Sequence, residues 1–165
     1  MLQLSILYPD CSSDSELIET AFANTLFIHL TRTDKLAQAI SFVKATQTGL
    51  WHATHDGVEL ERLSEPKEPV YDENAIESQL AKLKALDGDW ESWFAREGIE
   101  PLCITYENLS TDPTVELARI LGQLGLDSKL ACGLRPDVAK LADATNQRWM
   151  DRYRSECSAQ YESIE

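Results

Sequence analysis

Residues 25–47 constrain the fold of this chain more than any other part of it. An apolar run over 26–30 predicts a short buried strand, and the turn that follows it carries Arg32 and Asp34. Apolar residues then recur at helical spacing, which predicts an amphipathic helix from near Asp34 to about Trp51. A buried strand that leads into a helix is typical of α/β proteins with a parallel sheet.

The turn after this strand is the first candidate binding site. In open α/β sheets, ligands bind beyond the carboxyl ends of the strands. Arg32 lies at such an end, and Gln38 and Ser41 follow on the predicted helix. Because a guanidinium group pairs well with phosphate and a hydroxyl can donate to the same group, we predict a phosphate site. The alternative makes Arg32 a solvated residue paired with Asp34, itself most simply a helix N-cap, and makes Ser41 a space-filling helix residue.

The rest of the chain continues the alternation of strand and helix. A second strand is predicted over 101–106, and it also leads toward a helix, over 115–124. Further helices are predicted to begin at Ser12, to run from Asp72 to Gly98, and to contain Trp149 near the end of the chain. Because two strands are too few for a stable parallel sheet, we expect other strands to be supplied from elsewhere.

Residues 52–72 interrupt the pattern. They are polar and are broken by Pro66 and Pro69, so we predict a flexible loop that acts either as a functional flap or as a mobile excursion. His52 and His55 have the spacing of a weak metal-binding pair. No third ligand accompanies them, and we expect no metal site.

Composition narrows the class of function. The 165 residues suffice for a single domain over 1–165, and 43% of them are hydrophobic. A formal net charge of −13 argues against nucleic-acid and membrane-surface binding, although a local Arg cluster can still bind one anionic ligand. No apolar run approaches the ~20 residues that span a membrane, so we do not expect an integral membrane protein. Four scattered cysteines favour reduced thiols in a cytoplasmic protein.

Five segments of the chain, taken in order, carry a family resemblance. They are Phe27-Ile-His-Leu-Thr-Arg-Thr-Asp-Lys-Leu-Ala-Gln-Ala-Ile-Ser-Phe, Gln47-Thr-Gly-Leu-Trp-His, Gly88-Asp-Trp-Glu-Ser-Trp-Phe, Ile104-Thr-Tyr-Glu-Asn-Leu-Ser-Thr-Asp-Pro and Gln147-Arg-Trp-Met-Asp-Arg-Tyr-Arg. Together they resemble the bacterial trehalose/lipopolysaccharide-type sulfotransferases over nearly the whole chain. The resemblance implies a P-loop-like α/β fold in which helices flank a parallel sheet.

The resemblance also implies an activity. Such enzymes move a sulfuryl group from 3′-phosphoadenosine-5′-phosphosulfate (PAPS) to a hydroxyl of a carbohydrate or glycolipid, and they need no metal. The residues that would bind the donor are Arg32, Gln38, Ser41 and Arg152, and those that would border the acceptor are Gln47 and Trp51. Ordinary packing is the alternative for Trp51, and an ion pair with Asp151 or Glu156 is the alternative for Arg152.

The chain departs from the family pattern at its beginning. Members begin with a strand, a loop rich in Ser, Gly and Thr that cradles the 5′-phosphosulfate, and a helix. We find no such segment here, so the chain resembles the C-terminal part of the domain, and the general base, expected soon after that loop, stays unknown. We therefore expect the chain alone to be marginally stable or to form a homodimer.

Three functions are compatible with these observations. The first is a PAPS-dependent sulfotransferase. The second is a non-catalytic fragment of one, or an interaction module, which the missing phosphosulfate loop favours. The third is a kinase-like P-loop protein, against which the lack of a Gly-x-x-x-x-Gly-Lys segment counts.

Overall fold

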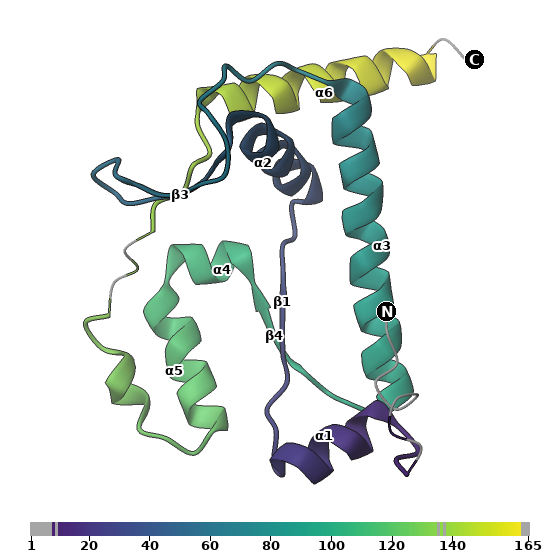
Figure 1. Ribbon diagram of the computed structural model, residues 1–165, viewed down its shortest axis with the longest axis vertical. Coiled ribbons are helices and arrows are strands. Elements are labelled where there is room, and N and C mark those ends of the chain that lie inside the picture. Colours follow the sequence, from purple (N-terminus) through teal and green to yellow (C-terminus); the bar gives the residue numbers. More distant parts are fainter. Residues whose placement is uncertain (1–7, 9, 135, 137, 163–165) are drawn as a thin grey trace. The chain divides into compact units, whose positions relative to one another are not determined.

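The computed structural model describes residues 8, 10–134, 136 and 138–162. Of residues 160–162 it describes the backbone alone. The chain divides into two compact units (Figure 1). The first unit comprises 1–33 and 85–135, and the second comprises 34–84 and 136–165. The long helix α3 (Glu73–Glu97) contributes residues to both units. The prediction of a single domain over 1–165 stays a prediction.

The first unit contains the parallel strands that the sequence predicted. Its β1 (Ile28–Thr31) pairs in parallel with β4 (Leu102–Thr105), with Ile28 opposite Leu102 and Thr31 opposite Thr105. The other elements of the unit, apart from its share of α3, are α1 (Asp14–Phe22), α4 (Tyr106–Thr111), α5 (Pro113–Gln123) and the 3-10 helix η2 (Ser128–Ala131). This mixture of helices with a small parallel sheet confirms the α/β prediction at that level.

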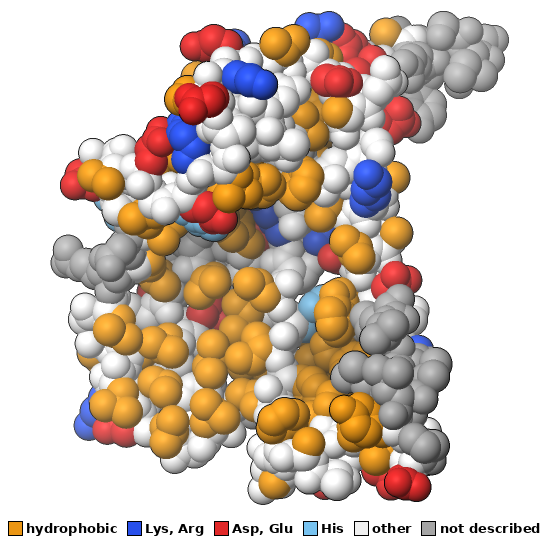
Figure 2. All heavy atoms as spheres, in the orientation of Figure 1, with side chains coloured by type: hydrophobic (Ala, Val, Ile, Leu, Met, Phe, Trp, Pro, Cys, Tyr) orange, Lys and Arg blue, Asp and Glu red, His pale blue; other side chains and the backbone are white. Residues whose placement is uncertain are grey.

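Strand β1 is more exposed than the sequence suggested. Ile28 is 43% exposed and Leu30 is 57% exposed, so the prediction of a buried strand was wrong for these two side chains. The physical reason is the small sheet, because two paired strands cover only part of each other's surface. Figure 2 also shows hydrophobic side chains at the surface over α5 and η2. No helix of the described residues is long and apolar enough to cross a membrane.

A buried polar contact anchors α1 to the aromatic part of α3. Ser13 caps α1 by accepting a hydrogen bond from the backbone of Glu16. The next residue, Asp14, is only 1% exposed, and its carboxylate accepts a 2.9 Å hydrogen bond from the indole Nε1 of Trp93. Phe94 packs against Trp93 with ring centroids 5.2 Å apart. Trp93 and Phe94 therefore form core in this part of α3, and the indole N–H of Trp93 has a partner.

The second unit packs two helices against the beginning of α3. Helix α2 (Lys35–Thr48) and α6 (Ala144–Glu162) contact each other. The core consists of Ala39, Ile40, Val43, Ile76 and Trp149, with Leu36, Tyr71, Ala75, Leu80, Leu83, Met150 and Tyr153 packed around it. The apolar set predicted for α2 therefore faces the core, as its helical spacing required.

The end of α2 differs from the prediction. Gly49 ends the helix in the left-handed conformation, at φ +74°, and the helix does not run to Trp51. Trp51 instead lies on β2 (Leu50–Ala53), which pairs antiparallel with β3 (Glu59–Arg62). The loop predicted over 52–72 thus contains part of a hairpin, while its flexibility stays a prediction.

The hairpin returns to the end of α2. Arg62 donates a 2.6 Å hydrogen bond to the carbonyl of Thr48, in the last turn of the helix. The backbone N–H of Leu63 donates to the carbonyl of Gly49 at 2.8 Å. Carbonyls at a helix end lack partners within the helix, and these two contacts satisfy them.

Candidate functional site

Arg32 follows β1 directly, at the carboxyl end of the parallel strands. Its side chain is 18% exposed and lies over the ring of Tyr106, 4.5 Å from the ring centroid. The Nε atom is 3.9 Å from a carboxylate oxygen of Glu107, which is too far for a hydrogen bond. This Nε atom is buried and has no hydrogen-bond acceptor among the described residues. A buried donor without an acceptor costs free energy, so the position suits an acceptor from a ligand.

Glu107 and Tyr106 shape the turn around Arg32. The second carboxylate oxygen of Glu107 accepts a 3.0 Å hydrogen bond from the backbone N–H of Thr33. Both residues come directly after β4, which runs parallel to β1, so the carboxyl ends of the two strands meet here. The turn is therefore fixed by side chains from the neighbouring strand end.

Helix α2 places three polar side chains on one face. The carboxylate of Asp34 accepts a 2.8 Å hydrogen bond from the backbone of Ala37, as predicted for an N-cap. Gln38, Ser41 and Lys44 then follow at intervals of three residues, which places them side by side along the helix. The side-chain oxygen of Gln38 is buried and receives no hydrogen bond within the described part of the chain.

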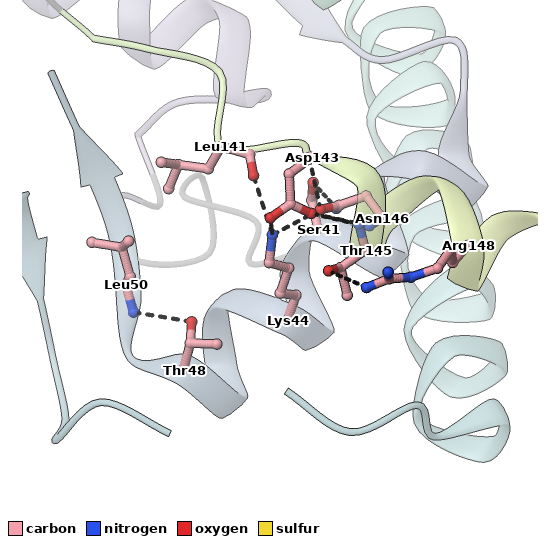
Figure 3. Close-up of polar contacts among 9 residues, drawn as sticks. All are labelled: Ser41, Lys44, Thr48, Leu50, Leu141, Asp143, Thr145, Asn146 and Arg148. Carbon is pink, nitrogen blue, oxygen red and sulfur yellow. Dashed lines mark hydrogen bonds and ion pairs between the residues drawn. The ribbon is translucent and has the colours of Figure 1, made fainter. Parts of the chain in front are cut away.

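Lys44 joins this face to the beginning of α6 (Figure 3). Its ammonium group donates to the side-chain oxygen of Asn146 at 3.0 Å and to the carbonyl of Leu141 at 3.3 Å. It also lies 2.7 Å from a carboxylate oxygen of Asp143. Asn146 is only 6% exposed, and its amide nitrogen donates a 3.3 Å hydrogen bond to the hydroxyl oxygen of Ser41. Ser41 is thus an acceptor in the one hydrogen bond that its hydroxyl makes with the described residues.

The carboxylate of Asp143 stabilises the first turn of α6. Burial raises the pKa of this carboxyl, but the hydrogen bond from Lys44 outweighs it, together with the backbone N–H groups of Asn146 and Thr145 and the charge of Lys44. The net result is a pKa below the ordinary value. The folded chain therefore stabilises the ionised form of this carboxyl more than the unfolded chain does.

This shift predicts a dependence of stability on pH. The contribution of Asp143 is complete above the ordinary Asp pKa of about 4 and is lost as the pH falls through the lower pKa of the folded chain. We expect urea unfolding between pH 2 and pH 6 to show a smaller loss of stability with acid in Asp143→Asn than in the unaltered chain. Parallel pH profiles of the two proteins would contradict this expectation.

Arg152 is occupied by contacts within the second unit. Its Nε donates a 2.7 Å hydrogen bond to Glu156, and its guanidinium lies 4.0 Å from the ring centroid of Tyr71. The hydroxyl of Tyr71 donates to the same Glu156 carboxylate at 2.5 Å. The side chain of Arg152 is 59% exposed. These contacts match the surface ion pair considered as the alternative for this residue, and a role in donor binding stays a prediction.

The two predicted acceptor residues have structural partners. The amide of Gln47 donates to the carbonyl of Val70 at 2.9 Å and accepts from its N–H at 2.8 Å. Trp51 packs edge-on against Phe42, with ring centroids 5.4 Å apart. Gln47 lies on α2 and Trp51 on β2, so the prediction that both lie on one helix was wrong.

The described residues contain no group of three His, Cys, Asp or Glu side chains that could hold a metal ion. The Nδ1 atom of His52 instead lies 2.5 Å from the carboxylate of Glu61, across the β2–β3 hairpin. All four cysteines are free thiols.

The sequence did not point to Lys44, Asp143 or Asn146. Asp143 stands one residue before α6, as a capping residue does, and this was the one available signal. The contacts of Lys44 and Asn146 join residues about a hundred positions apart, so spacing along the chain cannot reveal them.

Comparison with known proteins shows the family to which the chain is related. The Stf0 sulphotransferase family model matches residues 1–156. A trehalose 2-sulfotransferase of Mycobacterium tuberculosis is 34% identical over 151 residues, which cover 90% of this chain and 54% of that protein. A trehalose 2-sulfotransferase of Mycolicibacterium smegmatis is 31% identical over 140 residues, which cover 85% of this chain and 49% of that protein. The chain thus spans about half the length of these relatives.

Proposed function

Because the chain belongs to the Stf0 sulphotransferase family, we propose that it binds PAPS and serves the transfer of the sulfuryl group to a carbohydrate or glycolipid hydroxyl. The chain spans about half the length of its curated relatives, so donor binding and sulfuryl transfer are two separate proposals. The general base that would accept the proton of the acceptor hydroxyl is unassigned.

The buried Nε atom of Arg32 is the observation that most supports donor binding. It lacks an acceptor among the described residues, and it lies at the carboxyl end of two parallel strands. A guanidinium group pairs well with phosphate oxygens, and the ring of Tyr106 under the guanidinium restricts its orientation. We assign the 3′-phosphate of the donor to Arg32.

Residues of α2 are proposed to complete the contacts to the donor. The hydroxyl of Ser41 would donate a hydrogen bond to the 3′-phosphate. The buried side-chain oxygen of Gln38 needs a donor, which an amino or hydroxyl group of the nucleotide would supply. Arg152 is a weaker candidate, because Glu156 and Tyr71 already hold its guanidinium.

The acceptor is proposed from the relatives alone. Both are named trehalose 2-sulfotransferases, so a hydroxyl of trehalose is the first acceptor to test. Gln47 and Trp51 are the proposed acceptor contacts, and the aromatic face of Trp51 suits the apolar face of a sugar.

Calorimetric titration with adenosine 3′,5′-bisphosphate, the desulfated form of the donor, tests the donor site. We expect saturable binding that Arg32→Ala weakens about 10-fold or more, because a hydrogen bond to a charged group contributes ~1.5–3 kcal/mol. Arg119→Ala is the matched control, since Arg119 lies in the same unit and pairs with Glu116. Equal losses in both variants, or no binding by the folded unaltered chain, would refute the site.

The second candidate function is donor binding without catalysis, because the sequence shows no loop rich in Ser, Gly and Thr for the 5′-phosphosulfate. Incubation of the chain with PAPS and trehalose, followed by mass spectrometry of the sugar, separates the two functions. Sulfated trehalose would support the complete enzyme. Bisphosphate binding without sulfated sugar would support the non-catalytic module.

A further inference from the structure

A chain of hydrogen bonds leads from Lys44 through Asn146 to Ser41, within the second unit (Figure 3). The direction of each bond follows from the chemistry of the groups. An ammonium group can only donate, so the atom of Asn146 that faces Lys44 must be the oxygen. The backbone N–H of Asp143 donates to this same oxygen at 3.2 Å, which fixes the amide orientation a second time.

The orientation of Asn146 in turn sets the role of Ser41. With its oxygen held by Lys44 and Asp143, Asn146 presents its amide nitrogen to the hydroxyl of Ser41. An amide NH₂ group can only donate, so the oxygen of Ser41 is the acceptor and its proton must point elsewhere. Among the described residues, Ser41 donates no hydrogen bond.

Lys44 itself is not available to an anion. Its three donors already have three acceptors, which are the carbonyl of Leu141, Asn146 and Asp143. Its side chain is only 16% exposed, and the carboxylate of Asp143 balances its charge at 2.7 Å. The effect of Lys44 on a ligand therefore has to pass through Asn146.

We propose that Lys44 and Asn146 are positioning residues that hold the Ser41 hydroxyl as a hydrogen-bond donor to an anionic ligand. The inference rests on the proposed function, in which that ligand is the 3′-phosphate of the donor. Without Asn146, the hydroxyl is free to turn and to donate to the carbonyl one helical turn earlier, as serine does within helices. The hydrogen bond from Asn146 holds the hydroxyl oxygen in place, and in that position Ser41 makes no bond to the preceding turn among the described residues.

The test is the preference of the chain for adenosine 3′,5′-bisphosphate over adenosine 5′-monophosphate, measured by calorimetry. Only the bisphosphate carries the 3′-phosphate, so a merely structural defect lowers both affinities and leaves their ratio unchanged. Asn146→Asp reverses the contact, because a carboxylate accepts the Ser41 proton. We expect it to lower the preference about 10-fold, as Ser41→Ala does.

We call the contacts from Lys44 through Asn146 to Ser41 the relay. Further variants separate the effect of the relay from a simple effect of charge. In the Ser41→Ala background, Asn146→Asp is expected to cause no further loss of preference. The uncharged variant Asn146→Leu is expected to lower the preference as well, because it also frees the hydroxyl. Gln147→Ala is the matched control, since the neighbouring Gln147 bonds to Asp151 and should leave the preference unchanged.

Each outcome has a distinct meaning. A normal preference in Asn146→Leu, or an undiminished effect of Asn146→Asp in the Ser41→Ala background, would overturn the relay and leave the donor site intact. Equal binding of both nucleotides by the unaltered chain would overturn the 3′-phosphate site and the relay together.

Discussion

Replacing Gly49 by alanine is expected to destabilise the second unit by about 2–5 kcal/mol. Gly49 ends α2 at φ +74°, where a residue with a Cβ atom is strained by roughly 1–2 kcal/mol. A Cβ atom at this position would lie 2.6 Å from the carbonyl oxygen of Ser64 and 2.8 Å from its nitrogen. Because both atoms are backbone, the chain after β3 has to move, and overpacking of this kind adds roughly 1–3 kcal/mol.

Gly57→Ala is the matched control for this substitution. Gly57 belongs to the same unit and has φ +85°, but a Cβ atom there would meet nothing within 4 Å. It should therefore show the conformational strain alone. Urea unfolding followed by circular dichroism compares the two variants. Equal losses would mean that the contact with Ser64 contributes nothing to the effect.

Truncation of Ile40 to alanine is expected to reduce the free energy of unfolding by about 2–5 kcal/mol, the usual cost of emptying a fully buried site. Ile40 is 0% exposed and packs with Val43, Ile76 and Trp149, from three different helices of the second unit. The cavity cannot close without moving one of these helices. The loss should also reach α6, because Trp149 forms one wall of the core.

Leu60→Ala serves as the control for Ile40→Ala. Leu60 has the same number of carbon atoms and lies on β3 of the same unit, but it is 54% exposed. Its truncation should cost less than about 1 kcal/mol, since little apolar surface is removed from contact. Unfolding curves with tryptophan fluorescence as the signal compare the loss of stability in the two variants. Similar losses would show that Ile40 does not occupy a tightly packed core.

Local signals in the sequence gave several elements correctly. Asp34 is the N-cap of α2, and Asp72 accepts a hydrogen bond from the backbone of the first turn of α3. Gly98 follows the last residue of α3 at φ +66°. Each of these depends on a side chain and a backbone group a few residues apart, so the sequence is sufficient. The end of α2 was mispredicted because the apolar residues after Gly49 continue at a spacing that suits a helix and a strand alike.

Some features of the candidate site could be predicted from the sequence, and others could not. The sequence placed Arg32 at a strand end and Ser41 on the following helix, and both placements are confirmed. It could not show that the Nε atom of Arg32 lacks an acceptor among the described residues or that Gln47 holds the backbone of Val70, since both facts depend on the surrounding fold. For Arg152 the sequence offered Asp151 or Glu156 as an ion-pair partner, and only the structure selects Glu156 and adds the ring of Tyr71.

The sequence by itself determined the two parallel strands, the longer helices, several helix caps and the family, because these depend on residue type and spacing along the chain. Only the tertiary structure decided which polar atoms are bonded and in which direction. Ser41 is an acceptor because Asn146 donates to it, and Asn146 donates because Lys44 and Asp143 hold its oxygen. The direction of a hydrogen bond is a property of groups that meet in space, and Ser41 and Asn146 are 105 residues apart in the chain.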